Sequence, residues 1–118
     1  MDLVRFILSE VEGADGPVKA SALVGDDRTF AEVVYHIELL QAHGLVDARV
    51  TRLKSATIAE VDGLTWDGCD FLDSMRDDRV WDRAKRLIRE TVGSTSLTVL
   101  RTVCAKVAES MVLGQLGM

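Results

Sequence analysis

Apolar residues recur every three or four positions in five stretches of the chain, which is the spacing of amphipathic helices. This spacing predicts helices over residues 2–13, 29–43, 65–75, 77–92 and 94–113. Thr29 stands three residues before Glu32, the arrangement of a capping box, and Thr65 has a side chain suited to an N-cap. Gly44 follows the second stretch at the position where glycine commonly ends a helix. The pattern therefore predicts a mostly helical chain.

Between the second and third helices the period changes from helical to alternating. Apolar and polar residues alternate from Val46 to Leu53, the pattern of a half-buried strand. Lys54 to Ala56 suits a turn, and Thr57 to Leu64 suits a returning strand, which together predict a β-hairpin with a basic tip. The short segment from Val18 to Val24 is interpreted as a short strand or an irregular stretch.

The composition is that of a single folded domain. The chain has 118 residues, of which 47% are apolar and 28% are charged, enough to bury a core without metal or disulfide. Cys69 and Cys104 lie far apart without a CxxC or Cys/His cluster, so we expect reduced thiols rather than a disulfide. No apolar run reaches the about 20 residues of a bilayer span, and the first residues lack a signal-peptide pattern. We expect a cytoplasmic protein without membrane attachment.

Charge is distributed unevenly along the chain. The net charge is −5, but residues 1–75 hold six basic and fourteen acidic residues, whereas residues 76–118 hold eight basic and five acidic ones. An acidic body argues against attraction of nucleic acid to the whole surface. It allows a local basic patch, or an acidic face directed at a basic partner.

Two motifs resemble bacterial winged-helix repressors of the arsenic-sensor and multiple-antibiotic-resistance type. The recognition helix of those repressors is matched at Val33, His36, Ile37, Leu40, Gly44, Leu45 and Val46. Leu64, Thr65, Gly68 and Leu72 are similar to the L-T-x-x-G-x-x-x-L that closes the wing and opens the next helix. The resemblance implies a winged helix-turn-helix-like domain over residues 1–76. Residues 77–118 would then be C-terminal helices packed on this domain or mediating dimerisation.

Most of the chain also resembles a winged-helix family of unassigned function from bacteria and their prophages. The resemblance lies in Tyr35-His36, in the Leu64–Gly68 motif, in Phe71 to Asp77, and in a helix with Trp81 and basic residues. It implies no biochemical function. The chain departs from the repressors because Val18 to Arg28 is short for a separate helix before the recognition helix. Exposed positions on that helix are expected to be Val34, Tyr35, Glu38 and Gln41, rather than the basic residues that read bases.

By this resemblance, DNA would be bound by the recognition-like helix and the hairpin. Thr29, Tyr35 and Gln41 would face the groove, while Arg28, Arg49, Arg52 and Lys54 would contact phosphates. The alternative for the hairpin is a solvated edge that its charges protect from aggregation.

Two further surfaces are candidates for partner binding. Arg79, Arg83 and Arg86 form a stripe for nucleic acid or an acidic partner, or else a solvated face with local ion pairs. The apolar face of the last helix either folds back on the core or pairs with its twin in a homodimer. Its candidate residues are Leu97, Leu100, Val107 and Met111.

We expect no catalytic activity, metal or cofactor. His36 and His43 lie seven residues apart without a further ligand at suitable spacing, and Asp67, Asp70 and Asp73 suit a solvated helix better than a metal site. The sequence has no P-loop or dinucleotide motif. Two functions follow: a DNA-binding transcription regulator, phage- or prophage-associated by resemblance, or an acidic phage-encoded protein-interaction module that modulates a host complex. The sign of the charge on the recognition-like helix and hairpin would discriminate them.

Overall fold

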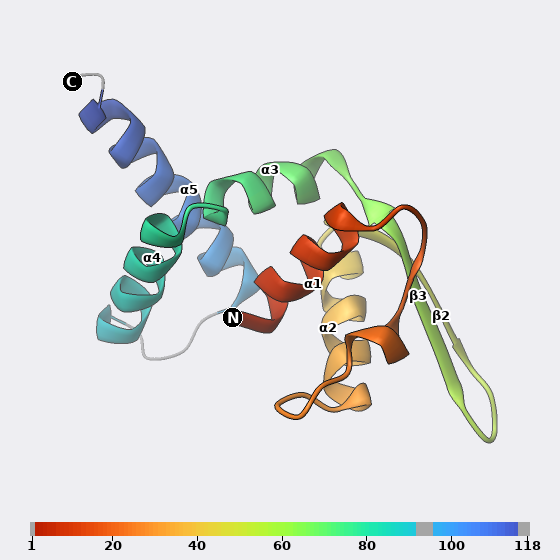
Figure 1. Ribbon diagram of the computed structural model, residues 1–118. Helices are drawn as coiled ribbons and strands as arrows, with labels where there is room; N and C mark the ends of the chain where they lie inside the picture. The colour runs from red at the N-terminus through yellow and green to blue at the C-terminus, as the bar shows by residue number, and fades with distance from the viewer. Residues whose placement is uncertain (1, 92–95, 116–118) are drawn as a thin grey trace. The chain divides into compact units, whose positions relative to one another are not determined.

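The computed structural model describes residues 2–91 and 96–115 (Figure 1). Its elements are α1 (Asp2–Gly13), β1 (Val18–Lys19), the 3-10 turn η1 (Ala20–Leu23), α2 (Phe30–Ala42), β2 (Val46–Arg52), β3 (Thr57–Leu64), α3 (Trp66–Met75), α4 (Asp78–Thr91) and α5 (Leu97–Gln115). The predicted fold class, mostly helical with a small antiparallel sheet and a C-terminal helix, is confirmed. The predicted start of the last helix at residue 94 lies outside the described residues.

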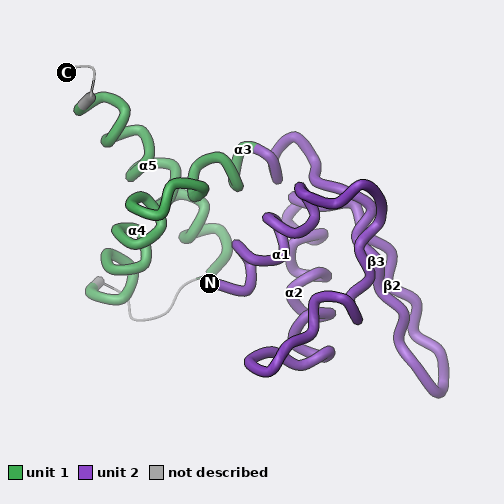
Figure 2. Tube along the Cα trace, in the orientation of Figure 1, with its two compact units in different colours: residues 1, 70–118 green, residues 2–69 purple. Residues whose placement is uncertain are grey.

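The chain forms two compact units, residues 2–69 and the described residues from 70 onward (Figure 2). We call them the N-terminal and the C-terminal unit. The division falls within α3, which contributes its first turn to the N-terminal unit.

A three-stranded antiparallel sheet in the order β1-β3-β2 supports the N-terminal unit. The side chains of β3 alternate, so that Ala59 and Val61 are buried while Asp62 is exposed and Glu60 is half-buried. The helices α1 and α2 lie on the buried side of this sheet (Figure 1). Ile7, Leu8, Val33, Ile37, Leu40 and Val61 are among the fully buried residues of this core.

The segment before α2 is short, as the sequence predicted. It consists of the two-residue strand β1 and the single turn η1, so the described residues contain no separate α-helix between α1 and α2. The side chain of Thr29 then accepts a hydrogen bond from the Glu32 backbone N–H at 3.2 Å. The predicted cap of α2 is therefore present, although the Glu32 carboxylate accepts from the Thr29 hydroxyl rather than from its backbone N–H.

The two sequence motifs meet at the end of α2. Gly44 has the positive φ of +71° that glycine adopts at a helix end. Thr65 donates its hydroxyl to the Gly44 carbonyl at 2.6 Å and its backbone N–H to the Leu45 carbonyl at 3.1 Å. The same hydroxyl accepts from the Gly68 N–H at 3.0 Å and so caps α3. The motif residues therefore join the start of α3 to the turn after α2.

The C-terminal unit is built on the packing of α4 against α5. Val80, Trp81, Ala84 and Ile88 of α4 are buried, as are Leu97, Leu100, Cys104 and Val107 of α5. Leu87 of α4 is 41% exposed. Within the described residues, neither Cys69 nor Cys104 forms a disulfide bond. Among the described helices, none is long and apolar enough to cross a membrane.

Candidate functional site: the recess between α2 and the β2–β3 hairpin

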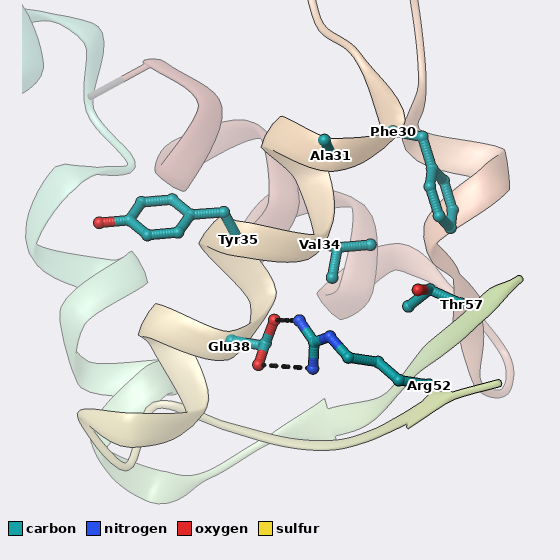
Figure 3. Close-up of a pocket in the computed structure, with 7 residues that line it drawn as sticks. All are labelled: Phe30, Ala31, Val34, Tyr35, Glu38, Arg52 and Thr57. Carbon is teal, nitrogen blue, oxygen red and sulfur yellow. Dashed lines mark hydrogen bonds and ion pairs between the residues drawn. The ribbon is translucent and has the colours of Figure 1, made fainter. Parts of the chain in front are cut away.

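A recess of about 270 Å³ lies between the outer face of α2 and the distal part of the hairpin (Figure 3). We call it the α2–hairpin recess. It is lined by Phe30, Ala31, Val34, Tyr35, Glu38, Arg52 and Thr57. Most of this lining is apolar, and one ion pair supplies its charge. Such a recess suits an apolar or aromatic side chain that also carries a polar group.

The ion pair of the recess joins α2 to the hairpin. Arg52 donates through both terminal nitrogens to the two carboxylate oxygens of Glu38, with Nη1 at 3.2 Å from Oε2 (Figure 3). The hydrogen bond from Arg52 lowers the pKa of Glu38, and the same contact raises the pKa of Arg52. The guanidinium predicted to grip phosphate is thus engaged by a carboxylate of the same chain.

Tyr35 lies three residues before Glu38 on α2, and its ring points away from the Glu38–Arg52 ion pair (Figure 3). Its side chain is 63% exposed on α2, and its ring meets that of His36 edge-on at 5.5 Å between centroids. His36 is held in turn by a 2.8 Å hydrogen bond between its Nδ1 and the Glu32 carbonyl. Val34 was expected to be exposed, but it is only 5% exposed because it faces the hairpin side of α2.

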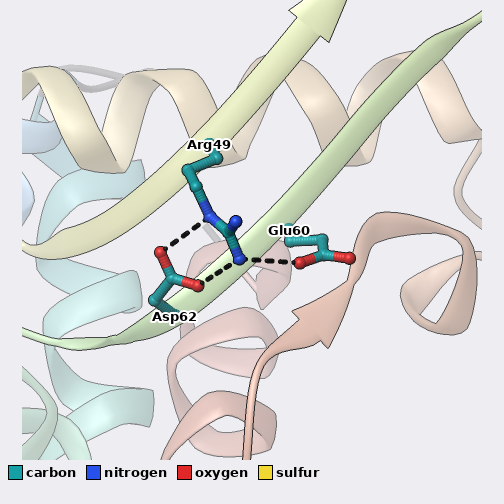
Figure 4. Close-up of polar contacts among 3 residues, drawn as sticks. All are labelled: Arg49, Glu60 and Asp62. Carbon is teal, nitrogen blue, oxygen red and sulfur yellow. Dashed lines mark hydrogen bonds and ion pairs between the residues drawn. The ribbon is translucent and has the colours of Figure 1, made fainter.

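Arg49 is neutralised on the opposite face of the hairpin. It donates to both oxygens of Asp62 at 2.9 and 3.1 Å and to Glu60 at 2.9 Å (Figure 4). The hydrogen bonds that Arg49 donates to Asp62, together with the charges of both acids, raise the pKa of Arg49. Glu60 is the direct cross-strand partner of Arg49, so the strand register itself creates this pair.

Arg28 has a structural position rather than an open one. Its Nε donates to the Leu23 carbonyl at 2.5 Å, and Nη1 pairs with Asp27 at 2.9 Å. The guanidinium lies 3.9 Å from the centroid of the Phe6 ring, and only 22% of the side chain is exposed. These contacts fasten the loop before α2 to α1, which leaves Arg28 poorly placed for a phosphate.

The remaining residues predicted to bind DNA have different surroundings. Thr29 is occupied as the N-cap of α2, Gln41 is exposed near the end of α2, and Lys54 is exposed in the hairpin turn. Residues 26–64, which include α2 and the hairpin, hold seven acidic and four basic residues, a net charge of −3. The local charge is therefore negative.

The residues predicted to bind a partner also differ in exposure. Arg79 is paired with Asp77 at 2.9 Å, whereas Arg83 and Arg86 are exposed on α4. Leu97, Leu100 and Val107 are buried within the single chain, and Met111 is half-buried. A homodimer through these α5 residues stays a prediction, and it would require α5 to leave α4.

The described part of the chain holds no group of three His, Cys, Asp or Glu side chains arranged for a metal ion. His36 is instead bonded to its own helix. Sequence reasoning missed the recess, because Thr57 and Phe30 meet only in the folded chain. It also missed the acidic partners of the hairpin arginines. The turn at residues 53–56 fixes the strand register that places Arg49 opposite Glu60. The Arg49–Glu60 pair could therefore have been predicted from the sequence.

Comparison with known proteins gives a family and one relative. The family described as "Hypothetical protein (DUF2513)" matches residues 1–95. An "Uncharacterized protein" of Haemophilus influenzae (strain ATCC 51907 / DSM 11121 / KW20 / Rd) is 32% identical over 115 residues, which cover 93% of this chain and 94% of that protein. No solved structure gives a significant match. The expected likeness to a family without assigned function is confirmed, and the chain belongs to the DUF2513 family.

Proposed function

We propose that this protein is a non-enzymatic protein-interaction module that binds a basic segment of a partner protein at the α2–hairpin recess. The observation that carries the proposal is the state of the hairpin arginines. Arg49 and Arg52 are both paired with carboxylates, on a region of net charge −3. A cytoplasmic modulator of a larger complex is the role we expect for such a module.

Electrostatics favour a basic partner over DNA. A protein gains affinity for DNA by placing basic groups on phosphates and releasing counterions. Here each hairpin arginine would first have to leave its carboxylate, which would then face the phosphates. A basic partner instead meets complementary charge, which accelerates encounter and excludes like-charged surfaces.

The lining of the recess also suits a protein partner. Exposed aromatic side chains in partly apolar surroundings are typical anchors of protein interfaces. Tyr35 supplies a ring that a guanidinium can stack on. Glu38 uses two acceptor positions for Arg52, and a carboxylate offers about four. An arginine of the partner can therefore contact Tyr35 and Glu38 together.

The test is a fluorescence-anisotropy titration with a labelled oligo-arginine peptide, an oligo-lysine peptide of equal length and a mixed-sequence DNA duplex. We expect tightest binding to oligo-arginine, weakened about tenfold by Tyr35→Ala because the stacking partner is lost. Tyr35→Phe keeps the ring and is the matched control. If the wild type and Tyr35→Ala bind both peptides with the same affinity, the recess has no role in binding.

A DNA-binding regulator is the second candidate, and the order of elements favours it. Helix α1, strand β1, helix α2 and the β2–β3 hairpin follow in the order of a winged-helix domain, with α2 as the recognition helix and the hairpin as the wing. The single turn η1 stands where the repressors have a separate helix. In a DNA-binding regulator, Arg49 and Arg52 would leave their carboxylate partners and, together with Lys54, contact phosphates. Tight duplex binding at low salt with a steep salt dependence would favour it over the recess.

A further inference from the structure

The exposed face of α4 carries three arginines without an ion-pair partner. Arg83, Arg86 and Arg89 are all exposed, and within the described residues none of the three guanidinium groups forms an ion pair. The hairpin arginines Arg49 and Arg52, by contrast, are paired with carboxylates. We call the three residues the α4 arginine row. Its free guanidinium groups are available to a partner.

The spacing of the row is regular. Successive members lie three residues apart, so their side chains are neighbours along one helix and the ends are about 9 Å apart along its axis. Like charges at this spacing destabilise an isolated helix. A row of anionic or aromatic groups with the same spacing would relieve the repulsion.

The outer face of α2 has such a row. Glu32, Tyr35 and Glu38 also follow one another at intervals of three residues. Glu32 is exposed, Tyr35 is 63% exposed, and the Glu38 side chain is 40% exposed despite its bond to Arg52. We call these residues the α2 row. Two carboxylates thus flank an aromatic ring at the spacing of the three arginines.

We propose that the α4 arginine row of one copy docks on the α2 row of a second copy. Arg86 stacks on Tyr35, and the two outer arginines reach the two glutamates. The surrounding charge is complementary, because residues 26–64 carry −3 while α4, with five basic and three acidic residues, carries +2. The inference rests on the proposed function, since it assigns a second copy of this chain as the basic partner of the α2 face.

The composition of α4 favours a protein surface over nucleic acid. Asp82 and Glu90 are exposed on the same helix and would repel phosphates. Four of the five basic residues of α4 are arginines, which pair with carboxylates through two parallel hydrogen bonds and stack on aromatic rings better than lysine. The contact joins two different surfaces, so each copy keeps one row open unless the assembly closes.

The experiment is sedimentation velocity of the full chain over a range of concentrations, at about 20 mM and about 300 mM NaCl. We expect reversible self-association that weakens at the higher salt. Arg86→Ala and Tyr35→Ala should each raise the self-association Kd about tenfold, while Tyr35→Phe should not. Far-UV circular dichroism of each variant controls for folding.

A charge swap tests the pairing itself. Glu32→Arg alone should abolish most association, whereas Glu10→Arg, the same charge change on exposed α1, should not. Arg83→Glu and Arg89→Glu are each added separately to Glu32→Arg. Only one of the two double variants should regain association, and that variant shows which arginine faces Glu32. Restoration in neither or in both cases overturns the proposal. A wild type that stays monomeric at low salt also overturns the proposal. If that monomer still binds oligo-arginine, the proposed function stands.

Discussion

At Gly68 the backbone of α3 lies directly against the backbone of the turn that follows α2. A Cβ placed there would stand 1.9 Å from the Leu45 carbonyl oxygen, so no larger residue fits without movement. Leu45 is itself fully buried and accepts the Thr65 N–H. The glycine of the L-T-x-x-G motif is therefore explained by close approach of two backbones rather than by a ligand.

Gly68→Ala should lower the free energy of unfolding by roughly 1–3 kcal/mol or more, because α3 or the turn must shift to admit the methyl group. Urea denaturation followed by circular dichroism measures it. Gly13→Ala is the control, since nothing lies within 4 Å of a Cβ at that position and alanine is the better helix former. Equal stability of Gly68→Ala and wild type would show that the contact is not tight.

The start of α4 is stabilised by one carboxylate. Asp77 accepts from the Arg79 backbone N–H at 2.7 Å and from the Arg79 guanidinium at 2.9 and 3.2 Å. The hydrogen bonds from Arg79, first from its side chain and then from its backbone, lower the pKa of Asp77 from 3.8 to about 2. The ionised carboxylate is thus favoured in the folded chain, as expected of an acid at a helix N-terminus.

This pKa shift predicts a pH dependence at the scale of the helix. Because the folded pKa is depressed, the contribution of Asp77 to stability is fully present above about pH 4 and is lost as the pH falls toward about 2. The Tm of Asp77→Asn should therefore lie below that of wild type at neutral pH, and the two should converge on acidification. Thermal melts between pH 2 and 6 test this, with Asp82→Asn on exposed α4 as control. A gap that stays constant over this range would argue against the shift.

Across the whole molecule, charge separates along the chain. The N-terminal unit holds twelve acidic and six basic residues, whereas residues 70–118 hold seven acidic and eight basic ones. Arg49 and Arg52 of the hairpin are paired with acids, so these two arginines present little positive charge to an anion. This distribution is the reason for placing a basic partner on α2 and for proposing that the α4 arginine row docks on the α2 row of a second copy.

Releasing the hairpin arginines should change the ligand preference. The triple variant Glu38→Gln, Glu60→Gln and Asp62→Asn frees Arg52 and Arg49, and we expect it to bind a mixed-sequence duplex at least about tenfold more tightly than wild type at low salt. Gel-shift or anisotropy titrations at two salt concentrations measure the gain.

The matched control for this prediction is Glu10→Gln, Asp15→Asn and Asp67→Asn. It removes the same net charge from exposed acids without releasing a hairpin arginine. If both triple variants gain equally, bulk charge rather than arginine pairing governs DNA binding. If the wild type already binds as tightly as the first variant, the arginines exchange partners freely and the DNA-binding candidate gains support.

The helices, the hairpin and their ends could be predicted from the amino-acid sequence, because they depend on local signals. The periods of about 3.6 and 2 residues, the Thr29 and Thr65 caps and Gly44 act within a few residues of one another. Which charged groups are paired depends instead on the folded arrangement of the chain. Arg49 meets Glu60 and Arg52 meets Glu38 across separations of 11 and 14 residues, and these contacts need both the strand register and the position of α2 over the sheet. Arg28 likewise turned inward because Phe6 of α1 lies within its reach. The partners of a long charged side chain depend on the folded backbone. The sequence therefore showed the charged residues of the candidate site but not how they pair.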